Sequence, residues 1–290
     1  MITAAGPEGR TFRLELAYEG SAYHGWQIQP NVATVQGEVE RALAKVAGGP
    51  VPVNGSSRTD AGVHAMGQVV SFEWPADRRP LSAYVLHRAL NGLLPADLSV
   101  LRLEPIAWMD AEGRPFHARH CSAGKRYRYA IWPHRIEHFM LRRTCWHVRR
   151  GPVAGGWARA HAAAQDLLGE HDFAAFRAAD CDARTTIRTL HRAEVLPPSS
   201  AETPAWVVVE GTAFLKYMVR IISGTLLDIA RGNLEPDAIR RMLETGDRRL
   251  GGLTAPPHGL MLEEVFYPDQ PWTLPRWSMP PNPDDRRART

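Results

Sequence analysis

VPVNGSSRTDAGVHAMGQVVSFEW (51–74) holds a polar loop, residues 56–65, between two stretches that alternate in the manner of β-strands. The loop contains Asp-Ala-Gly, a combination typical of a tight turn. It also carries Arg58, Asp60 and His64 within seven positions. Asp60 alone could be a carboxylate that caps its own turn. A turn needs neither the arginine nor the imidazole, so the combination indicates a functional site.

The segments on either side of this loop form a symmetrical pattern. Apolar residues at helical spacing and alternating residues at strand spacing predict one helix and one further strand outward in each direction. The predicted elements are strand 11–19, helix 34–46, strand 51–55, strand 67–74, helix 82–93 and strand 98–104. This β-α-β-β-α-β order is the signature of a ferredoxin-like unit.

In helix 34–46 the buried face is expected to be Val35, Val39, Leu43 and Val46, with Thr34 as the N-terminal cap. The second half of the chain repeats the order of elements, with extra pieces and without a detectable sequence repeat. Its predicted elements are strands 125–132, 144–148, 189–196, 205–214 and 259–267, and helices 156–169, 215–231 and 236–244. We therefore predict an α+β protein with two ferredoxin-like, or RRM-like, halves and antiparallel sheets.

Composition points to a soluble cytoplasmic protein. The chain has 290 residues, of which 44% are hydrophobic, enough for a sizeable core. The first ten residues, MITAAGPEGR, do not resemble a signal peptide, and no stretch approaches the roughly eighteen apolar residues of a membrane span. The three cysteines are widely spaced, which argues against a disulfide framework.

Positive charge is concentrated in one window. Between Arg114 and Arg150 there are ten lysines or arginines and one acidic residue, Glu137, whereas the chain as a whole carries a net charge of +4. Such a window favours a polyanionic partner, although a solvated face of an arginine-rich protein is the alternative. We expect an N-terminal domain over 1–113 with the Asp60 loop, a C-terminal domain over 114–270 with a basic, RNA-facing strand, and a tail over 271–290.

A metal site is considered at HARHC, where His117, His120 and Cys121 lie close together. No second ligand pair follows at the spacing of a zinc finger or ribbon, so we expect no metal here and interpret the cluster as a polar strand edge.

Two further features could serve chemistry. In strand 125–132 the side chains of Tyr127 and Tyr129 share one face and those of Arg126 and Arg128 the other. The tyrosines suit base stacking, with ordinary core positions as the alternative. In helix 215–231, Arg220 lies close to the apolar stripe, where a guanidinium needs a carboxylate partner or must reach solvent at the rim.

The motif GSSRTDAGVHAMGQVVSF (55–72) resembles that of the tRNA pseudouridine synthase A family. Six further stretches resemble the same family in the same order, over nearly the whole chain. They are YEGSAYHGWQIQPNVATVQGEVERAL (18–43), LNGLLPADLSV (90–100), FHARHCSAGKRYRY (116–129), LLGEHDFAAFRAADCDART (167–185), FLKYMVRIISGTLLDIARG (214–232) and APPHGLMLEEVFYP (255–268).

The resemblance implies a pseudouridine synthase fold in which the two sheets are joined. It implies isomerisation of uridine to pseudouridine at positions 38, 39 and 40 of the tRNA anticodon stem-loop, without metal or other cofactor, by a homodimer. The C1′–N1 bond of the nucleotide breaks, the uracil turns, and C5 bonds to C1′. A carboxylate can stabilise the positive charge that develops on the sugar or attack carbon covalently, and the sequence leaves open whether Asp60 attacks the sugar, attacks the base or acts electrostatically. The target nucleotide must be flipped out of its stack.

By motif match, the resemblance gives Asp60 as the essential aspartate and Arg220 as its partner. Tyr127 matches the tyrosine that packs against the target base, and Leu262 an apolar residue near the pocket. Arg58 matches an arginine that helps to displace the base and hold the RNA. His64 orients the loop or contacts RNA, with a purely structural role as the alternative.

The sequence departs from the family pattern at two places. Ser57 stands where glycine is usual, which raises the question of whether the backbone there needs a left-handed angle. His120 and Cys121 stand where an aromatic and a small residue are usual.

Three alternatives remain from sequence. They are a pseudouridine synthase acting on another RNA, a non-catalytic RNA-binding protein with twin RRM-like halves, and a metal-dependent nuclease that uses Asp60, His64 and Asp180.

Overall fold

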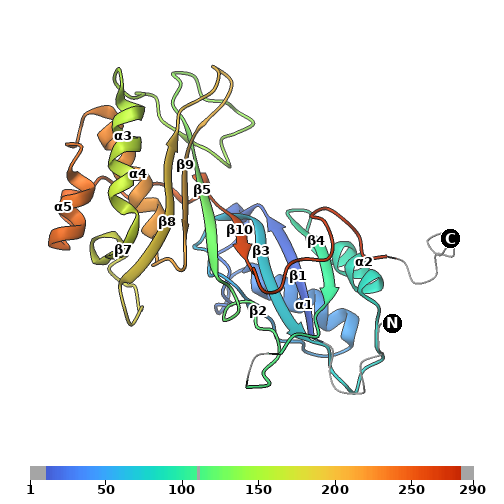
Figure 1. Cartoon of the computed structure of the whole chain (residues 1–290). Coiled ribbons are helices and arrows are strands. Elements are labelled where there is room, and N and C mark those ends of the chain that lie inside the picture. Colours follow the sequence, from blue (N-terminus) through green and yellow to red (C-terminus); the bar gives the residue numbers. More distant parts are fainter. Residues whose placement is uncertain (1–10, 110–111, 282–290) are drawn as a thin grey trace. The chain divides into compact units, whose positions relative to one another are not determined.

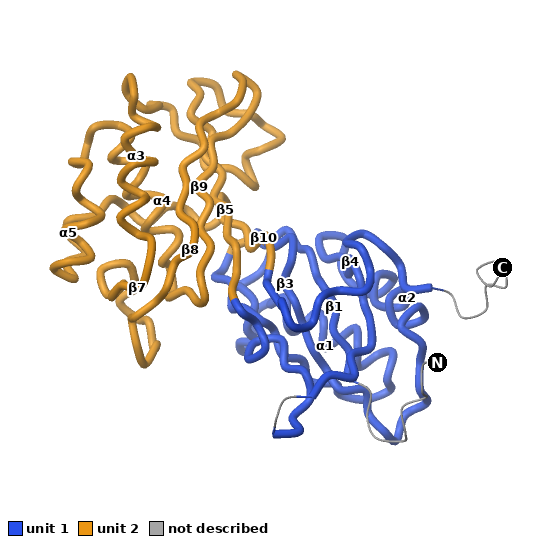
Figure 2. The backbone as a smooth tube through the Cα atoms, in the orientation of Figure 1, with its two compact units in different colours: residues 1–61, 65–123, 265–290 blue, residues 62–64, 124–264 orange. Residues whose placement is uncertain are grey.

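The computed structural model describes residues 11–109 and 112–281 of the chain. These residues form two compact units (Figures 1 and 2). Of the described residues, unit 1 holds 11–61, 65–123 and 265–281 apart from 110–111, and unit 2 holds 62–64 and 124–264. The chain therefore passes between the units within the Asp60 loop, immediately after Ala61.

The sheet of unit 1 is antiparallel and has β1 (Thr11–Tyr18) at its centre. On one side β1 pairs with β3 (His64–Glu73) and on the other with β4 (Leu98–Pro105). The short strand β2 (Asn54–Gly55) pairs with β3, so the order is β4-β1-β3-β2. The predicted strand 51–55 is thus reduced to its last two residues.

Two helices complete the β-α-β-β-α-β order of unit 1. Helix α1 (Val35–Ala47) is capped by Thr34, whose Oγ1 accepts a hydrogen bond from the Gly37 amide at 3.3 Å. Helix α2 (Ala83–Leu93) is capped by Ser82 in the same manner. The predicted face of α1 is buried except for Val46, which is only half-buried because the last turn buries Ala47 instead.

Unit 1 also includes two segments that follow its helices and strands in sequence. The sequence interpretation placed residues 114–123 in a second domain and 271–281 in a tail, whereas in the structure both pack with unit 1. Phe116 contacts the ring of Tyr267, with ring centroids 5.2 Å apart. The buried Arg13 donates to the carbonyl oxygens of Gln270 and Pro271 at 2.5 and 2.6 Å. Residues 282–290 of the predicted tail lie outside the described residues.

The strands of unit 2 are mostly antiparallel. Their order is β10-β5-β9-β8-β7, with a two-residue strand, β6, parallel to the end of β5. The strands are β5 (Gly124–Trp132), β6 (Trp146–His147), β7 (Gly169–Asp172), β8 (Ile187–Leu196), β9 (Ala205–Gly211) and β10 (Leu260–Phe266). Strand β7 was not predicted, because its polar sequence GEHD carries no alternation of apolar residues.

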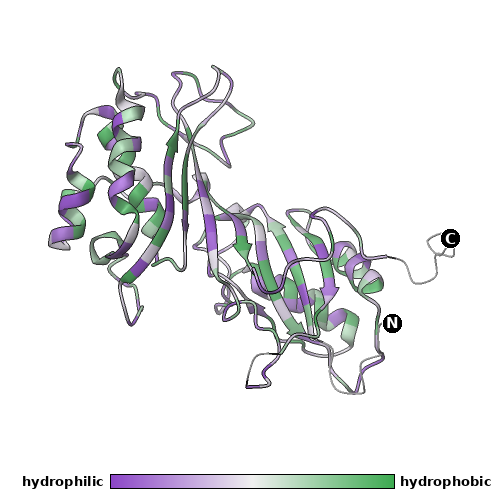
Figure 3. Cartoon of the chain, viewed as in Figure 1, coloured by the Kyte–Doolittle hydropathy of each residue, from purple (hydrophilic) through white to green (hydrophobic). Residues whose placement is uncertain are grey.

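The helices of unit 2 are α3 (Gly156–Ala164), α4 (Met218–Arg231) and α5 (Ala238–Thr245). Helices α3 and α5 show both hydrophilic and hydrophobic stretches of ribbon (Figure 3), as expected where one face packs on the unit and the other meets water. Helix α4 begins three residues later than predicted, because Tyr217 adopts a left-handed conformation with φ of 65°. Within the described chain, no helix has the length and hydrophobicity needed to cross a membrane.

Candidate active site

The chain before Asp60 is held by a fully buried glutamine. The side chain of Gln68 accepts hydrogen bonds from the Ser56 hydroxyl at 2.8 Å and the Ser57 amide at 3.2 Å. Its amide nitrogen donates to the Ser57 carbonyl at 2.7 Å. Both backbone groups of Ser57 are therefore paired, which fixes the start of the loop.

Ser57 does not adopt a left-handed conformation. A serine is therefore accommodated here without the backbone angle that glycine would permit. The departure from the family pattern at this position therefore needs no left-handed backbone angle.

The residue directly before Asp60 is also fixed within unit 1. The Thr59 carbonyl accepts a hydrogen bond from the Trp26 amide at 3.0 Å, and its hydroxyl lies 2.8 Å from the Tyr18 hydroxyl. Thr59 is buried, Asp60 is half-buried and Arg58 is exposed. The loop therefore leaves the arginine open to solvent while holding the backbone next to the carboxylate.

The chain after Asp60 is fixed within unit 2. Gly62 has a φ of 76°, in the left-handed region that glycine adopts easily. A Cβ at this position would lie only 3.1 Å from Pro257 Cγ, so a residue without a side chain also fits the space best. His64 is 5% exposed, and its Nε2 lies 3.0 Å from the His258 carbonyl oxygen. Because a carbonyl can only accept, Nε2 must carry the hydrogen. This bond favours the loop-orienting role of His64 over contact with RNA.

Arg220 reaches the same stretch of unit 2. Its Nε donates to the Ala255 carbonyl at 2.8 Å, and the Ala255 amide donates back to the Arg220 carbonyl at 3.1 Å. The guanidinium lies over the ring of Tyr217, 4.3 Å from its centroid, in cation–π geometry. These contacts orient the Arg220 head group, whereas its pairing with Asp60 stays a prediction.

Tyr127 and Leu262 are buried on the strands β5 and β10 of unit 2. The Tyr127 ring meets Phe214 edge to face, with centroids 5.0 Å apart. Tyr129, on the same face of β5, is fully buried and donates from its hydroxyl to the Pro256 carbonyl at 2.7 Å. Burial raises the pKa of Tyr129 well above its ordinary value, so the hydroxyl keeps the proton that it donates.

The arginines on the other face of β5 are paired with carboxylates. Arg126 contacts Glu210 at 2.5 Å and Glu264 at 3.0 Å, and Arg128 contacts Glu263 at 2.9 Å. The charge that this strand contributes to the basic window is therefore largely compensated within unit 2. The exposed arginines of the window are Arg114, Arg119, Arg135, Arg142, Arg143, Arg149 and Arg150.

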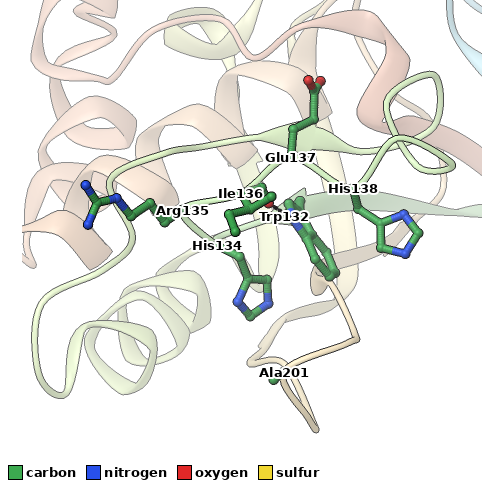
Figure 4. A pocket seen from close by; sticks show the side chains of 7 residues that line it. All are labelled: Trp132, His134, Arg135, Ile136, Glu137, His138 and Ala201. Carbon is green, nitrogen blue, oxygen red and sulfur yellow. Dashed lines mark hydrogen bonds between the residues drawn. The ribbon is translucent and has the colours of Figure 1, made fainter.

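The structure also has two cavities at other places. One, of about 350 Å³, is bordered by Trp132, His134 and His138, and the Trp132 indole donates to the Ile136 carbonyl at 2.8 Å (Figure 4). The other, of about 430 Å³, lies in unit 1 beside His117. Neither is lined by a predicted site residue.

In the HARHC segment, His117 forms hydrogen bonds with the backbone of the segment itself. His117 Nδ1 accepts hydrogen bonds from the amides of Arg119 and His120 at 3.1 and 3.4 Å. Asp180, which the nuclease alternative would need, forms an ion pair with Lys216 at 2.6 Å on the surface. Among residues 11–109 and 112–281 there is no group of three or more histidine, cysteine or acidic side chains arranged to hold a metal ion.

The comparison with known proteins decides the family. The family model of tRNA pseudouridine synthase matches residues 16–112 and 163–268. The chain belongs to the tRNA pseudouridine synthase family. It is 43% identical to tRNA pseudouridine synthase A of Coxiella burnetii (strain Dugway 5J108-111) over 92% of this chain and 97% of that protein.

Two further relatives of the same name agree with this membership. The protein of Myxococcus xanthus is 43% identical over 89% of this chain and 92% of its own length. The protein of Geotalea uraniireducens (strain Rf4) is 42% identical over 89% of this chain and 100% of its own length. This synthase is therefore an enzyme of an isomerase family, as the motifs indicated.

Sequence reasoning did not predict the contacts that two residues, Gln68 and Tyr129, make beside the candidate site. Gln68 was only one position in a predicted strand, and nothing local indicated that its amide would meet the loop. The position of Tyr129 on the same strand face as Tyr127 was a weak indication of a role near the site. Its hydrogen-bond partner, Pro256, could not be predicted because it lies 127 residues away.

Proposed function

We propose that this enzyme isomerises uridine to pseudouridine at positions 38, 39 and 40 of the tRNA anticodon stem-loop, with Asp60 as the essential carboxylate. The single observation that carries the proposal is the Asp60 loop. Upstream of Asp60 the backbone groups of Ser57 and Thr59 are hydrogen-bonded, and downstream the imidazole of His64 bonds to the His258 carbonyl. A half-buried carboxylate held so firmly suits a group that must meet one sugar carbon.

The chemistry requires only this chain and its substrate. The C1′–N1 bond breaks, a bond forms between C1′ and C5, C5 loses its proton and N1 regains one, so the nucleotide keeps its composition. The ionised carboxylate of Asp60 stabilises the positive charge that develops on the sugar. No redox or group-transfer partner enters the balance, and we propose that the enzyme works without a cofactor.

The remaining site residues have roles around this carboxylate. Arg220 pairs with Asp60 and favours its ionised form. Tyr127 covers the freed uracil, and Leu262 contributes an apolar wall. Arg58, which is exposed, holds the displaced strand of the RNA. His64 is assigned to loop orientation because its ring is buried and bonded to a carbonyl.

The wider assignment follows from the same family. We propose tRNA as the partner, a homodimer as the working form and the cytoplasm as its location. We also propose that both halves are ferredoxin-like. The β4-β1-β3-β2 order of unit 1 supports this description for the first half.

The test is position-resolved detection of pseudouridine on an unmodified tRNA with uridines at the three positions. Wild type, Asp60→Asn and Asp180→Asn are compared with metal chelated. Wild type and Asp180→Asn should modify the stem-loop, because Asp180 is an exposed residue that forms a surface salt bridge with Lys216. Asp60→Asn should bind the tRNA with similar affinity and form no pseudouridine.

Two results would overturn the proposal. Modification by Asp60→Asn at the wild-type rate would remove the carboxylate from the chemistry. If the wild type bound the tRNA without modifying it, a non-catalytic RNA-binding protein would be favoured. Transcriptome-wide pseudouridine mapping would then test the other alternative, a synthase that acts on another RNA.

A further inference from the structure

A short stretch of unit 2, Ala255–Gly259, accepts hydrogen bonds from three separate elements. The Ala255 carbonyl accepts from Arg220, the Pro256 carbonyl from Tyr129 and the His258 carbonyl from His64. We call this stretch the carbonyl segment. Pro256 and Pro257 have restricted backbone angles and no amide hydrogen, so the segment is stiff and is rich in acceptors.

Two of these three donors, Arg220 and His64, belong to or lie close in sequence to the proposed reacting groups. Arg220 is the proposed partner of Asp60, and the carbonyl segment fixes the direction of its guanidinium through Nε. His64 ends the loop that carries Asp60, and Gly62 packs against Pro257 two residues after the carboxylate. A displacement of the carbonyl segment would therefore move Arg220 and the part of the loop that follows Asp60, residues 62–64.

The third donor, Tyr129, touches neither group through a hydrogen bond of its own. Its ring is fully buried, and it meets Trp146 edge to face at 6.1 Å. The chain passes so close to this ring that a Cβ on Gly259 would lie 2.6 Å from Tyr129 Cζ. The ring and the hydroxyl thus hold the carbonyl segment from the side of strand β5.

We infer that Tyr129 is a positioning residue, whose hydroxyl sets the carbonyl segment and through it the placement of Arg220 and of the loop after Asp60. The inference rests on the proposed function and deepens it. Tyr129 does not touch the substrate in this scheme, so its effect must appear in the rate of the chemical step and not in the binding of RNA.

Tyr129→Phe tests this inference because it keeps the packed ring and removes only the donor to Pro256. The first-order rate in single-turnover experiments should fall about 10- to 100-fold, since small displacements of reacting groups have effects of this size. The affinity for tRNA should stay within about twofold of the wild type.

Tyr23→Phe is the matched control. Tyr23 is also buried, and its hydroxyl also donates a hydrogen bond, to Oδ1 of Asp97 at 2.6 Å within unit 1. Both variants should lower the melting temperature by a similar few degrees. Only Tyr129→Phe should reduce the rate.

A double-mutant cycle with Arg220→Lys separates positioning from general destabilisation. Lysine lacks the Nε donor that meets Ala255, so the route from the carbonyl segment to residue 220 is interrupted. If Tyr129 acts along this route, Tyr129→Phe should have a markedly smaller effect in the Arg220→Lys background than in the wild type.

Hydrogen exchange gives a readout that does not need activity. Exchange at Ala255 and at residues 62–64 should accelerate in Tyr129→Phe and stay unchanged in Tyr23→Phe. Equal rates of reaction for the two variants, or additive effects in the cycle, would overturn the inference. Failure of the wild type to form pseudouridine would overturn the proposed function instead, and unchanged exchange would then still reject the role of Tyr129.

Discussion

Gln68 shows how one side chain can determine the shape of the loop that carries Asp60. It is fully buried, and its amide satisfies the amide and the carbonyl of Ser57 as well as the Ser56 hydroxyl. A buried polar group that loses its partner costs about 1–3 kcal/mol. The Gln68 amide is therefore needed for the position of the loop more than for the sheet in which it lies.

Replacement of this residue gives the first prediction at the residue scale. Gln68→Leu roughly preserves side-chain volume but removes the two hydrogen bonds between Gln68 and the Ser57 backbone. We expect a loss of stability of about 1–3 kcal/mol and a fall of at least about tenfold in the single-turnover rate of pseudouridine formation. Differential scanning fluorimetry and the single-turnover assay measure the two effects.

Ser57→Gly is the control for this prediction. Because Ser57 is not left-handed, glycine gains nothing here and only increases the freedom of the unfolded chain, at a cost of about 0.5–1 kcal/mol. Its reaction rate should stay within about twofold of the wild type. A higher rate for Ser57→Gly would mean that the serine constrains the loop unfavourably.

Helix α2 is attached to its neighbouring strand by a polar contact beside a buried histidine. The Asn91 side chain exchanges two hydrogen bonds with the backbone of Val100, at 2.9 and 3.0 Å. One turn earlier, His87 is 7% exposed, and its Nδ1 is buried without a hydrogen-bond partner. Burial lowers the pKa of His87 below its ordinary value of 6.5.

This histidine should make the stability of unit 1 depend on pH. Since its pKa is lower in the folded than in the unfolded state, the unfolded state binds more protons at acid pH. The contribution of His87 is fully present above pH 6.5 and is lost as the pH falls through that value toward the folded pKa. The wild type should therefore melt at a lower temperature at about pH 5.5 than at about pH 7.5.

His87→Leu should reduce this difference, because it removes the titrating group and its unpaired nitrogen together. Exposed His191→Gln is the control and should leave the difference unchanged. The histidines His117 and His258 also have lowered pKa values through burial, so part of the pH dependence should remain. An identical pH dependence in wild type and His87→Leu would contradict the assignment.

On the scale of the whole molecule, unit 1 is completed by chain from the far end of the sequence. The ring of Trp272 lies between the guanidinium groups of Arg13 and Arg102, at 4.2 and 4.0 Å from its centroid. Both arginines also pair with buried carboxylates, Arg13 with Glu104 and Arg102 with Glu15. The segment after β10 therefore encloses a charge network that would otherwise face water.

Trp272→Ala should destabilise unit 1 by about 2 kcal/mol, through lost packing and two lost cation–π contacts. Trp277→Ala, five residues further along, is the matched control, since Trp277 is 67% exposed, and its effect should stay within about 0.5 kcal/mol. Chemical denaturation followed by tryptophan fluorescence measures both. Equal stability of the two variants would show that the segment contributes little to unit 1.

The sequence by itself determined most local elements and the motif of the Asp60 loop. The cap at Thr34 and the apolar spacing of Val35, Val39 and Leu43 depend on residues within a few positions of each other, so helix α1 could be predicted from them. The Asp60 motif was recognised for the same reason, since its residues are consecutive. Strand β7 and the left-handed Tyr217 were missed because their conformation depends on neighbours from elsewhere in the chain.

Only the tertiary structure decided which of these residues have partners. Arg126 and Glu210 are 84 positions apart and meet because the register of β5 and β9 places them opposite each other. Tyr129, Arg220 and His64 meet the carbonyl segment from three distant parts of unit 2. Hydrogen bonds and ion pairs act over a few ångströms, and only packing of the strands and helices brings such remote groups within that range.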